Sequence, residues 1–78
     1  MKENNFFKSS DLSLIATTQL FGYPIEALDR ENPNKIQFVI KHDENLDKIV
    51  QAFWSRSLSV EPLAYFESLK NIKSRIYQ

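Results

Sequence analysis

The chain has 78 residues and no cysteine, so no disulfide can hold its fold together. A domain of this size gains only about 3–5 kcal/mol of stability from a single hydrophobic core. A structural metal is not expected either, because the chain has one histidine, His42, and no clustered metal ligands. Packed apolar faces must therefore supply the stability, with an oligomer interface as the one further source. Hydrophobic residues make up 42% of the sequence and aromatic residues 13%, which is enough for such a core.

The clearest helix signal lies in residues 44–56. Four apolar residues there follow the i, i+3, i+4, i+7 spacing of a helix that packs one face on a core. These residues are Leu46, Ile49, Val50 and Phe53. Asp43 precedes them as an N-cap candidate, since its carboxylate can accept backbone hydrogen bonds. The serines after Arg56 compete with the helical backbone and favour an end of the helix there.

Another helix is expected to follow Ser9 and Ser10, whose hydroxyls are N-cap candidates, and to end at Gly22. Asp11 would fall in its first turn, where a negative charge is favourable. Its apolar positions follow helical spacing. They are Leu12, Ile15, Ala16 and Leu20, with Leu14 and Phe21 widening the apolar surface. The less buried side is expected to hold Ser13, Thr17 and Thr18.

The last helix is expected to begin at Pro62, because proline suits the first turn of a helix. Its apolar side chains form one stripe at helical spacing, with Phe66 beside that stripe. The members of the stripe are Tyr65, Leu69, Ile72 and Ile76.

Residues 24–41 carry the signals of a β-hairpin. Residues 35–41 alternate between two faces, as a half-buried strand does. One of these faces carries Ile36, Phe38 and Ile40. The turn signal is Glu31-Asn32-Pro33-Asn34, in which proline presets φ and asparagine tolerates tight turns. Near the N-terminus, the aromatic segment Phe6-Phe7-Lys8 favours a short edge strand.

These elements predict an α+β fold in the order β-α-β-β-α-α, with a small antiparallel sheet packed against three helices. Residues 1–78 are expected to form a single globular domain, of which residues 1–5 are flexible. A short, exposed edge strand at Phe6-Phe7 would let two copies pair into a homodimer. The predicted core consists of Leu12, Ile15, Leu20, Ile36, Phe38, Ile40, Ile49, Phe53, Leu69 and Ile72.

Two motifs enclose this pattern. The first is Phe7-Lys8-Ser9-Ser10-Asp11-Leu12-Ser13-Leu14, continued to Leu20 and Gly22, and the second runs from Val60-x-Pro62-x-x-Tyr65 through Leu69-Lys70 to Ile76-Tyr77. Together they resemble the opening and the ending of a small bacterial and phage-associated domain family of unknown function. The resemblance covers residues 6–77. It implies one compact α+β domain in a phage or mobile-element setting, and nothing catalytic.

Two short clusters carry groups that catalysis or metal binding uses. In His42-Asp43-Glu44, three adjacent residues before a helix point in different directions, whereas metal ligands must converge. In Ser9-Ser10-Asp11, a hydroxyl and a carboxylate have no assured base beside them. Helix capping explains both clusters. We therefore predict no enzymatic activity, no catalytic residue, no cofactor and no bound metal.

The formal net charge of +0 disfavours nucleic-acid binding, which gains most of its affinity from several Lys or Arg contacts with phosphates. Residues 1–47 hold five basic and eight acidic groups, however, and residues 48–78 hold five basic and two acidic groups. The alternative hypothesis is therefore a nucleic-acid-binding accessory protein of a phage or mobile element. Its candidate residues are Lys48, Arg56, Lys70, Lys73 and Arg75. They would have to converge on one surface, although Lys73 and Arg75 lie about 200° apart around a helix.

The leading hypothesis is a non-enzymatic protein-interaction or adaptor module, with a homodimer as one form of it. Its candidate anchors are Trp54, Leu58 and Tyr77, provided that their side chains are exposed. Trp54 falls at the edge of the apolar stripe of the 44–56 helix, and aromatic residues at such edges often serve as interface hot spots. For Trp54 itself, packing in the core is favoured over this exposed role.

No part of the sequence has the run of about 20 apolar residues that crosses a bilayer. Residues 1–5 also lack the apolar region of a secretory signal. Together with the absence of cysteine, these features favour the cytoplasm and no membrane partner.

Overall fold

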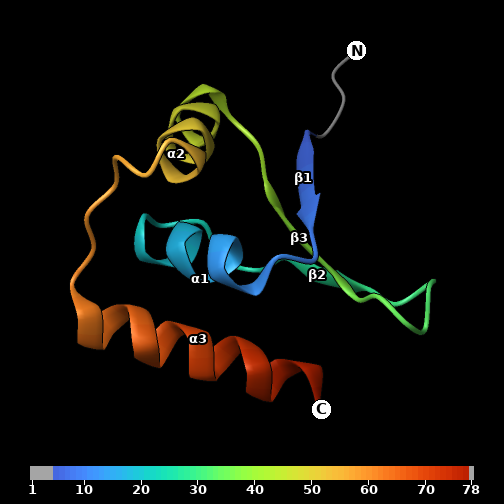
Figure 1. Cartoon of the computed structure of the whole chain (residues 1–78). Helices are drawn as coiled ribbons and strands as arrows, with labels where there is room; N and C mark the ends of the chain where they lie inside the picture. Colours follow the sequence, from blue (N-terminus) through green and yellow to red (C-terminus); the bar gives the residue numbers. More distant parts are fainter. Residues whose placement is uncertain (1–4, 78) are drawn as a thin grey trace.

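The computed structural model describes residues 5–77, which form a three-stranded antiparallel sheet and three helices (Figure 1). The elements are β1 (Phe6–Ser9), α1 (Leu12–Leu20), β2 (Ala27–Asp29), β3 (Gln37–Lys41), α2 (Glu44–Trp54) and α3 (Pro62–Ile76). This α+β order, β-α-β-β-α-α, confirms the prediction. Of the segment 1–5, for which flexibility is expected, residues 1–4 lie outside the described part. Asn5 is held by its carbonyl, which accepts a hydrogen bond of 3.0 Å from the His42 N–H.

β3 is the central strand of the sheet, whose order is β1-β3-β2. β2 and β3 form the predicted hairpin, in which Leu28 lies opposite Phe38. β1 pairs antiparallel with the other side of β3 and places Phe7 opposite Ile40. β1 is therefore an edge strand, as the sequence indicates.

An ion pair joins the two outer strands. Lys8 of β1 and Asp29 of β2 are separated by β3, and their Nζ and Oδ2 atoms lie 2.9 Å apart. The hydrogen bond from Lys8 lowers the pKa of Asp29, and the same bond raises the pKa of Lys8. The pair is open to solvent, so its contribution to stability is small.

The core lies where α1 meets the inner face of the sheet. Phe38 and Ile40 of β3 are buried there, as their alternation predicts. The other buried members of this cluster are Ile15, Ala16, Leu46 and Ile72. The predicted core residues Leu12, Ile36, Phe53 and Leu69 are partly buried. α1 contacts α2, α3 and β1, and Figure 1 shows it between α2 and α3, so α1 is the element around which the others pack.

Two of the three α1 residues expected on the less buried side are in fact buried, whereas Ser13 is partly exposed. Thr17 and Thr18 are almost fully covered. Their hydroxyls donate hydrogen bonds to the carbonyls of Ser13 (2.8 Å) and Ile15 (2.9 Å). Burial therefore leaves these hydroxyls satisfied. The expectation was wrong because helices cover α1 on two sides.

Two residues assigned to the core are exposed. Leu20 is 37% exposed and Trp54 is 61% exposed. Leu20 ends α1 and Trp54 ends α2, so both side chains lie at the margin of the packed part of their helix. Apolar residues can follow helical spacing up to the last residue of a helix, although the elements that cover the helix end before that residue. For this reason both core assignments were wrong.

The caps follow the expected chemistry with one change. Asp11, rather than Ser9 or Ser10, is the N-cap of α1, and its Oδ1 accepts hydrogen bonds from the backbone N–H groups two and three residues later. Ser9 instead accepts a hydrogen bond from the Asp11 N–H through its Oγ. Aspartate and serine are about equally good N-caps, so the path of the chain, and not the strength of the cap, selects Asp11. Asp43 caps α2 as predicted, and Gly22 takes the left-handed conformation with φ 93°.

α3 is 15 residues long and begins at Pro62, as predicted. The carboxylate of Glu61 caps it by accepting hydrogen bonds from the N–H groups of Leu63 (3.1 Å) and Ala64 (2.7 Å). Among the residues that the structure describes, no helix combines the length and apolarity needed to cross a bilayer.

Candidate interaction surface

α3 packs on α1 through one face. That face contains the predicted stripe of Tyr65, Leu69, Ile72 and Ile76. Ser68 lies among them and is buried, and its hydroxyl donates a hydrogen bond of 2.9 Å to the carbonyl of Ala16 in α1. Because serine and alanine are both small, the two helix backbones can approach closely at this point. The bond sets the position of α3 along α1.

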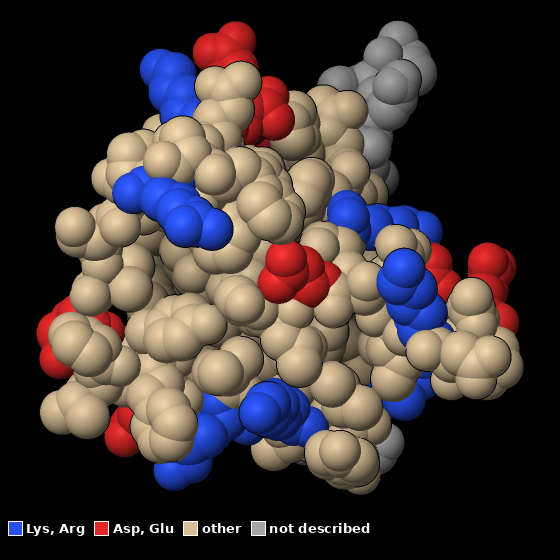
Figure 2. All heavy atoms as spheres, viewed as in Figure 1, with Lys and Arg blue, Asp and Glu red and all other residues tan. Residues whose placement is uncertain are grey.

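The basic candidates are distributed over several surfaces. Lys70 and Lys73 lie on the exposed side of α3, and Arg75 lines a groove between α3 and α1. Lys48 lies on α2, and Arg56 follows the end of α2. In Figure 2, the Lys and Arg side chains form separate groups on the visible face, with acidic and uncharged residues between them. The structure thus brings Lys70 and Lys73 together and places the other three elsewhere.

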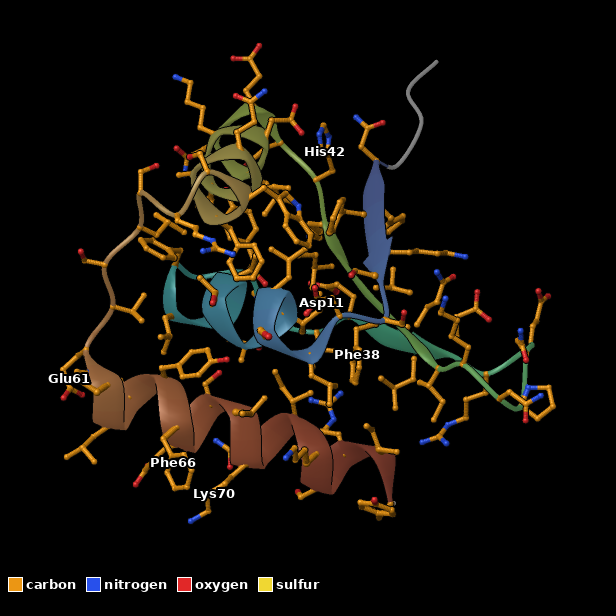
Figure 3. All side chains as sticks on the ribbon, in the orientation of Figure 1. Asp11, Phe38, His42, Glu61, Phe66 and Lys70 are labelled. Carbon is orange, nitrogen blue, oxygen red and sulfur yellow. The ribbon has the colours of Figure 1, made fainter. Side chains whose placement is uncertain are left out.

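The side of α3 opposite α1 carries a second stripe with apolar members. Leu63 is 71% exposed, Phe66 56% and Tyr77 86%. Lys70 and Lys73 lie between Phe66 and Tyr77 on the same side. Figure 3 shows Phe66 and Lys70 projecting away from α1. We call these five residues the outer stripe.

The outer stripe has the spacing of a helix–helix interface. Its members follow one another at intervals of three, four, three and four residues, which averages 3.5 residues and matches the repeat with which two helices pack side by side. Within it, the Nζ atom of Lys70 lies 5.4 Å from the centroid of the Phe66 ring, a cation–π contact. Sequence reasoning placed Phe66 beside the inner stripe and gave Leu63 no role. The 3.5-residue spacing was the signal that could have found both.

The three candidate anchors do not form one surface. Trp54 is exposed at the end of α2, where its ring meets the Phe53 ring edge to face with centroids 5.0 Å apart. Leu58 is half-buried and lines a hollow together with Phe53 and Tyr65. Tyr77 follows α3, a helix about 22 Å long at 1.5 Å per residue, and so lies far from the segment that joins α2 to α3. Of the three, only Tyr77 belongs to the outer stripe.

The turn after α2 contains a strained residue. Arg56 has φ 63°, the left-handed region that glycine usually occupies. Its N–H donates to the carbonyl of Phe53 (3.1 Å), and the N–H of Ser57 donates to the carbonyl of Ala52 (2.9 Å). These two bonds form a Schellman motif with Arg56 at its C′ position.

The polar groups around His42 form hydrogen bonds that join the segment after α1 and the end of β3 to the start of α2. The Nε2 atom of His42 lies 2.8 Å from Oδ1 of Asp47. The Tyr23 hydroxyl donates a hydrogen bond of 2.6 Å to Oδ1 of Asp43. That bond, followed by the cap bond from the Leu46 N–H, lowers the pKa of Asp43, and it also raises the pKa of Tyr23. Each of these groups thus has a structural partner.

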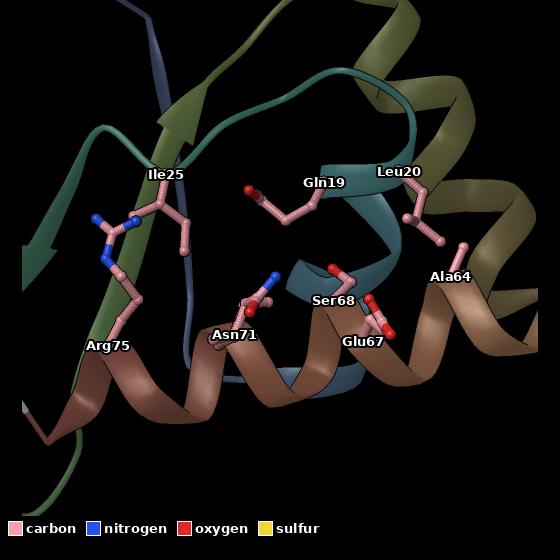
Figure 4. A pocket seen from close by; sticks show the side chains of 9 residues that line it. Gln19, Leu20, Ile25, Ala64, Glu67, Ser68, Asn71 and Arg75 are labelled. Atoms are coloured by element: carbon pink, nitrogen blue, oxygen red, sulfur yellow. The ribbon is translucent and has the colours of Figure 1, made fainter.

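A groove of about 400 Å³ runs between α1 and α3, on a different side of α3 from the outer stripe (Figure 4). Its apolar lining comes from Leu20, Ile25, Ala64 and Ile72, and its polar lining from Gln19, Glu67, Ser68, Asn71 and Arg75. Figure 4 shows Asn71 between Arg75 and Glu67 along α3, with Gln19 facing them from the end of α1. The groove therefore combines an apolar floor with a positive charge at its Arg75 end and a negative charge at Glu67, towards its other end.

One comparison with known proteins identifies a family. The model of the family described as Domain of unknown function (DUF5659) matches residues 4–78. This agrees with the expectation of a family of unknown function that covers nearly the whole chain. No curated protein and no solved structure matches the chain.

Proposed function

Because the chain belongs to DUF5659, a family of unknown function, its role must be inferred from its own surface, and we propose that it is a non-enzymatic protein-interaction module. The binding site in this proposal is the outer stripe of α3, and the ligand is a helix of a partner protein. The observation that carries the proposal is the exposure of Leu63, Phe66 and Tyr77 along one helix whose opposite face is already packed. Exposed apolar groups gathered on one face are typical of interaction sites.

The spacing of the stripe supports a helical ligand. Side chains at alternating intervals of three and four residues form a straight seam along α3, and a second helix can insert its own side chains between them. A partner lying along the whole of α3 would follow a seam of about 22 Å. Within residues 5–77, no other element covers this side of α3.

The charges of the stripe define the partner further. Lys70 and Lys73 occupy its middle, so the matching helix carries acidic residues there and apolar residues opposite Leu63 and Phe66. A second copy of the same stripe is a poor partner. Lys70 is the central member, so an antiparallel pair of stripes would bring Lys70 against itself, and a parallel pair would align both lysines with their copies.

Nucleic acid is the weaker candidate for the same surface. Aromatic side chains among lysines, such as Phe66 and Tyr77 here, are also typical of single-strand binding. The stripe offers only two cations, however, and acidic Glu67 lies on the same helix. Binding to phosphates draws on more positive contacts than this. A protein helix uses the apolar members of the stripe as well as the lysines.

Two earlier predictions stand beside this proposal. A homodimer through β1 remains a prediction, supported by the position of β1 at the edge of the sheet and by the exposure of Phe6. A phage or mobile-element setting rests on the resemblance of the opening and closing motifs alone.

A designed peptide tests the proposal. The probe is a labelled amphipathic helix with leucines at a 3.5-residue repeat and two glutamates positioned to meet Lys70 and Lys73, and fluorescence anisotropy measures its binding. Phe66→Ser is expected to weaken binding about tenfold or more, because an exposed aromatic anchor contributes roughly 1.5–3 kcal/mol when buried. Lys70→Glu should weaken binding of the peptide with glutamates and strengthen binding of a version in which lysines replace those glutamates.

Matched variants keep this test specific. Phe21→Ser removes an exposed aromatic side chain at the end of α1, and Lys48→Glu makes the same charge reversal on α2. Both should leave peptide binding unchanged. Unchanged binding by Phe66→Ser would contradict the proposal. So would tighter binding of a mixed-sequence oligonucleotide that weakens steeply with salt, since that result would assign the stripe to nucleic acid.

A further inference from the structure

The α1–α3 groove has a charge order of its own. Glu67, Asn71 and Arg75 are spaced four residues apart, so they follow one edge of α3. At 1.5 Å per residue, the backbones of Glu67 and Arg75 lie about 12 Å apart. All three side chains line the groove, and Figure 4 shows Asn71 between the two charged residues. The edge is thus negative at one end, amide-bearing in the middle and positive at the other end.

The positive end is strengthened by a residue from another element. Arg30, which follows β2, directs its Nη2 towards the carbonyls of Arg75 (3.5 Å) and Ile76 (3.4 Å). Those carbonyls form the negative end of the α3 dipole. Their partial negative charge would otherwise lower the positive potential that Arg75 creates in the groove. Arg30 offsets this field, so the Arg75 end of the groove attracts a carboxylate.

The middle of the groove can pair with a peptide backbone. The Asn71 side chain has both a donor and an acceptor, and no hydrogen bond to another residue of the described chain occupies them. Opposite it, the amide nitrogen of Gln19 donates to the Tyr23 carbonyl, which leaves the Gln19 oxygen as an acceptor. The two edges thus present a donor and acceptors across an apolar floor that includes Ile25 and Ile72.

From these features we infer that the groove binds a short extended peptide with free termini. Its amino terminus lies at Glu67, its carboxylate at Arg75, and its backbone pairs with Asn71 and Gln19. An extended chain advances about 3.3 Å per residue, so about four residues span the 12 Å between the charged ends. Alternate side chains then face the apolar floor. This site is independent of the outer stripe and of the function proposed for it.

The test compares one tetrapeptide of alternating leucine and alanine in four forms: free, acetylated, amidated, and blocked at both ends. Titration is followed by ¹⁵N–¹H NMR of the full chain, which reports the dissociation constant and the residues affected. The free peptide should shift the amide signals of Gln19 and Asn71. Each blocked terminus should weaken binding about fivefold to tenfold, the effect of one partly exposed charge-assisted hydrogen bond.

Variants identify which end of the peptide meets which residue. Arg75→Gln should weaken binding of the free peptide by the same factor as amidation does. It should leave binding of the amidated peptide unchanged. Glu67→Gln should weaken binding of the free peptide by the same factor as acetylation does, and it should leave binding of the acetylated peptide unchanged. Lys73→Gln, on the same helix but in the outer stripe, is the matched control and should change nothing here.

Several results would overturn the inference. One is the absence of shifts at Gln19 and Asn71, and another is equal binding of the free and the doubly blocked peptide. A third is equal binding of free leucine and the tetrapeptide, which would make the ligand a small zwitterion. Loss of binding by Lys73→Gln would place the peptide on the outer stripe instead. Because the helical probe reports on that stripe separately, failure at one site can be told from failure at the other.

Discussion

Replacing Arg56 with glycine should stabilise the protein, although glycine is the most flexible residue. Arg56 follows the C-cap residue of α2 and has φ 63°. A residue with a Cβ atom loses about 1–2 kcal/mol in this left-handed conformation. Glycine adopts it without that penalty but loses about 0.5–1 kcal/mol more than alanine in backbone entropy on folding. The difference predicts a gain of about 0.5–1 kcal/mol in the free energy of unfolding for Arg56→Gly.

Thermal unfolding followed by circular dichroism measures this gain. In a domain of this size, 1 kcal/mol shifts Tm by about 4–8 °C, so Arg56→Gly should raise Tm by about 2–8 °C. Arg56→Ala is the matched variant, because it removes the same side chain but keeps the Cβ atom and its strain. Its Tm should equal that of the wild type or lie slightly below it.

The comparison of the two variants decides the cause. An equal rise in Tm for alanine and glycine would mean that the side chain or charge of Arg56, and not its backbone, destabilises the protein. A lower Tm for Arg56→Gly would mean that the entropy of glycine outweighs the relief of strain. Either result would refute the reasoning from φ.

Ser68→Ala should lower the free energy of unfolding by about 1 kcal/mol, because it removes the buried hydrogen bond between α3 and α1, and urea denaturation measures the change. By the same assay, Ile72→Ala should cost about 2–5 kcal/mol because its side chain is buried. Leu63→Ala in the outer stripe should change stability by less than about 0.5 kcal/mol. The hydrogen bond from Tyr23 lowers the pKa of Asp43 in the folded protein, so its stabilising effect is complete above the ordinary value of 3.8 and is lost as the pH falls below it. Urea denaturation over a pH series should therefore show that the free energy of unfolding falls less at acidic pH for Asp43→Asn than for the wild type.

Each of these predictions has a contrary outcome. Equal losses for Leu63→Ala and Ile72→Ala would show that the outer stripe is covered in solution. An unchanged Ser68→Ala variant would show that the bond to α1 does not help to dock α3. Parallel stability curves for Asp43→Asn and the wild type below pH 4 would show that the hydrogen bond from Tyr23 does not favour the charged carboxylate.

The hairpin and the helix starts could be predicted because their causes are local. Alternation in residues 35–41 places Phe38 on the apolar face of the strand whatever surrounds it, and this face is the one that is buried. Asp43 and Pro62 favour helix starts through their own hydrogen-bonding and φ preferences. Asp11 replaced the predicted serine caps because several cap residues stood side by side, and only the path of the chain selects one.

Burial could be predicted less well because it depends on the neighbours of each helix. Thr17 and Thr18 are buried since α1 is covered on two sides, and the polarity of the residues gives no sign of this. Trp54 has a large aromatic side chain of the kind found in cores, but it lies at the end of α2, beyond the covered part of the helix.

The candidate sites depend on the fold in the same way. α3 has two stripes with apolar members, and spacing alone does not say which one meets α1. The close approach at Ser68 and Ala16 selects the inner stripe and leaves Leu63 and Phe66 exposed. The groove joins Gln19 to a helix that begins more than forty residues later, so no local motif could indicate it.

The central position of β3 also affects how the chain folds. Residues 28 and 38 pair within the hairpin, whereas residues 7 and 40 pair only after the chain has closed a loop that contains α1 and the hairpin itself. Closing the longer loop costs more chain entropy, so we expect the hairpin to form first and β1 to be added later. Until then, one edge of β3 is unpaired and accepts β1 from any chain. At high protein concentration, two folding chains can therefore exchange their first strands and form a domain-swapped dimer with the same sheet in each half.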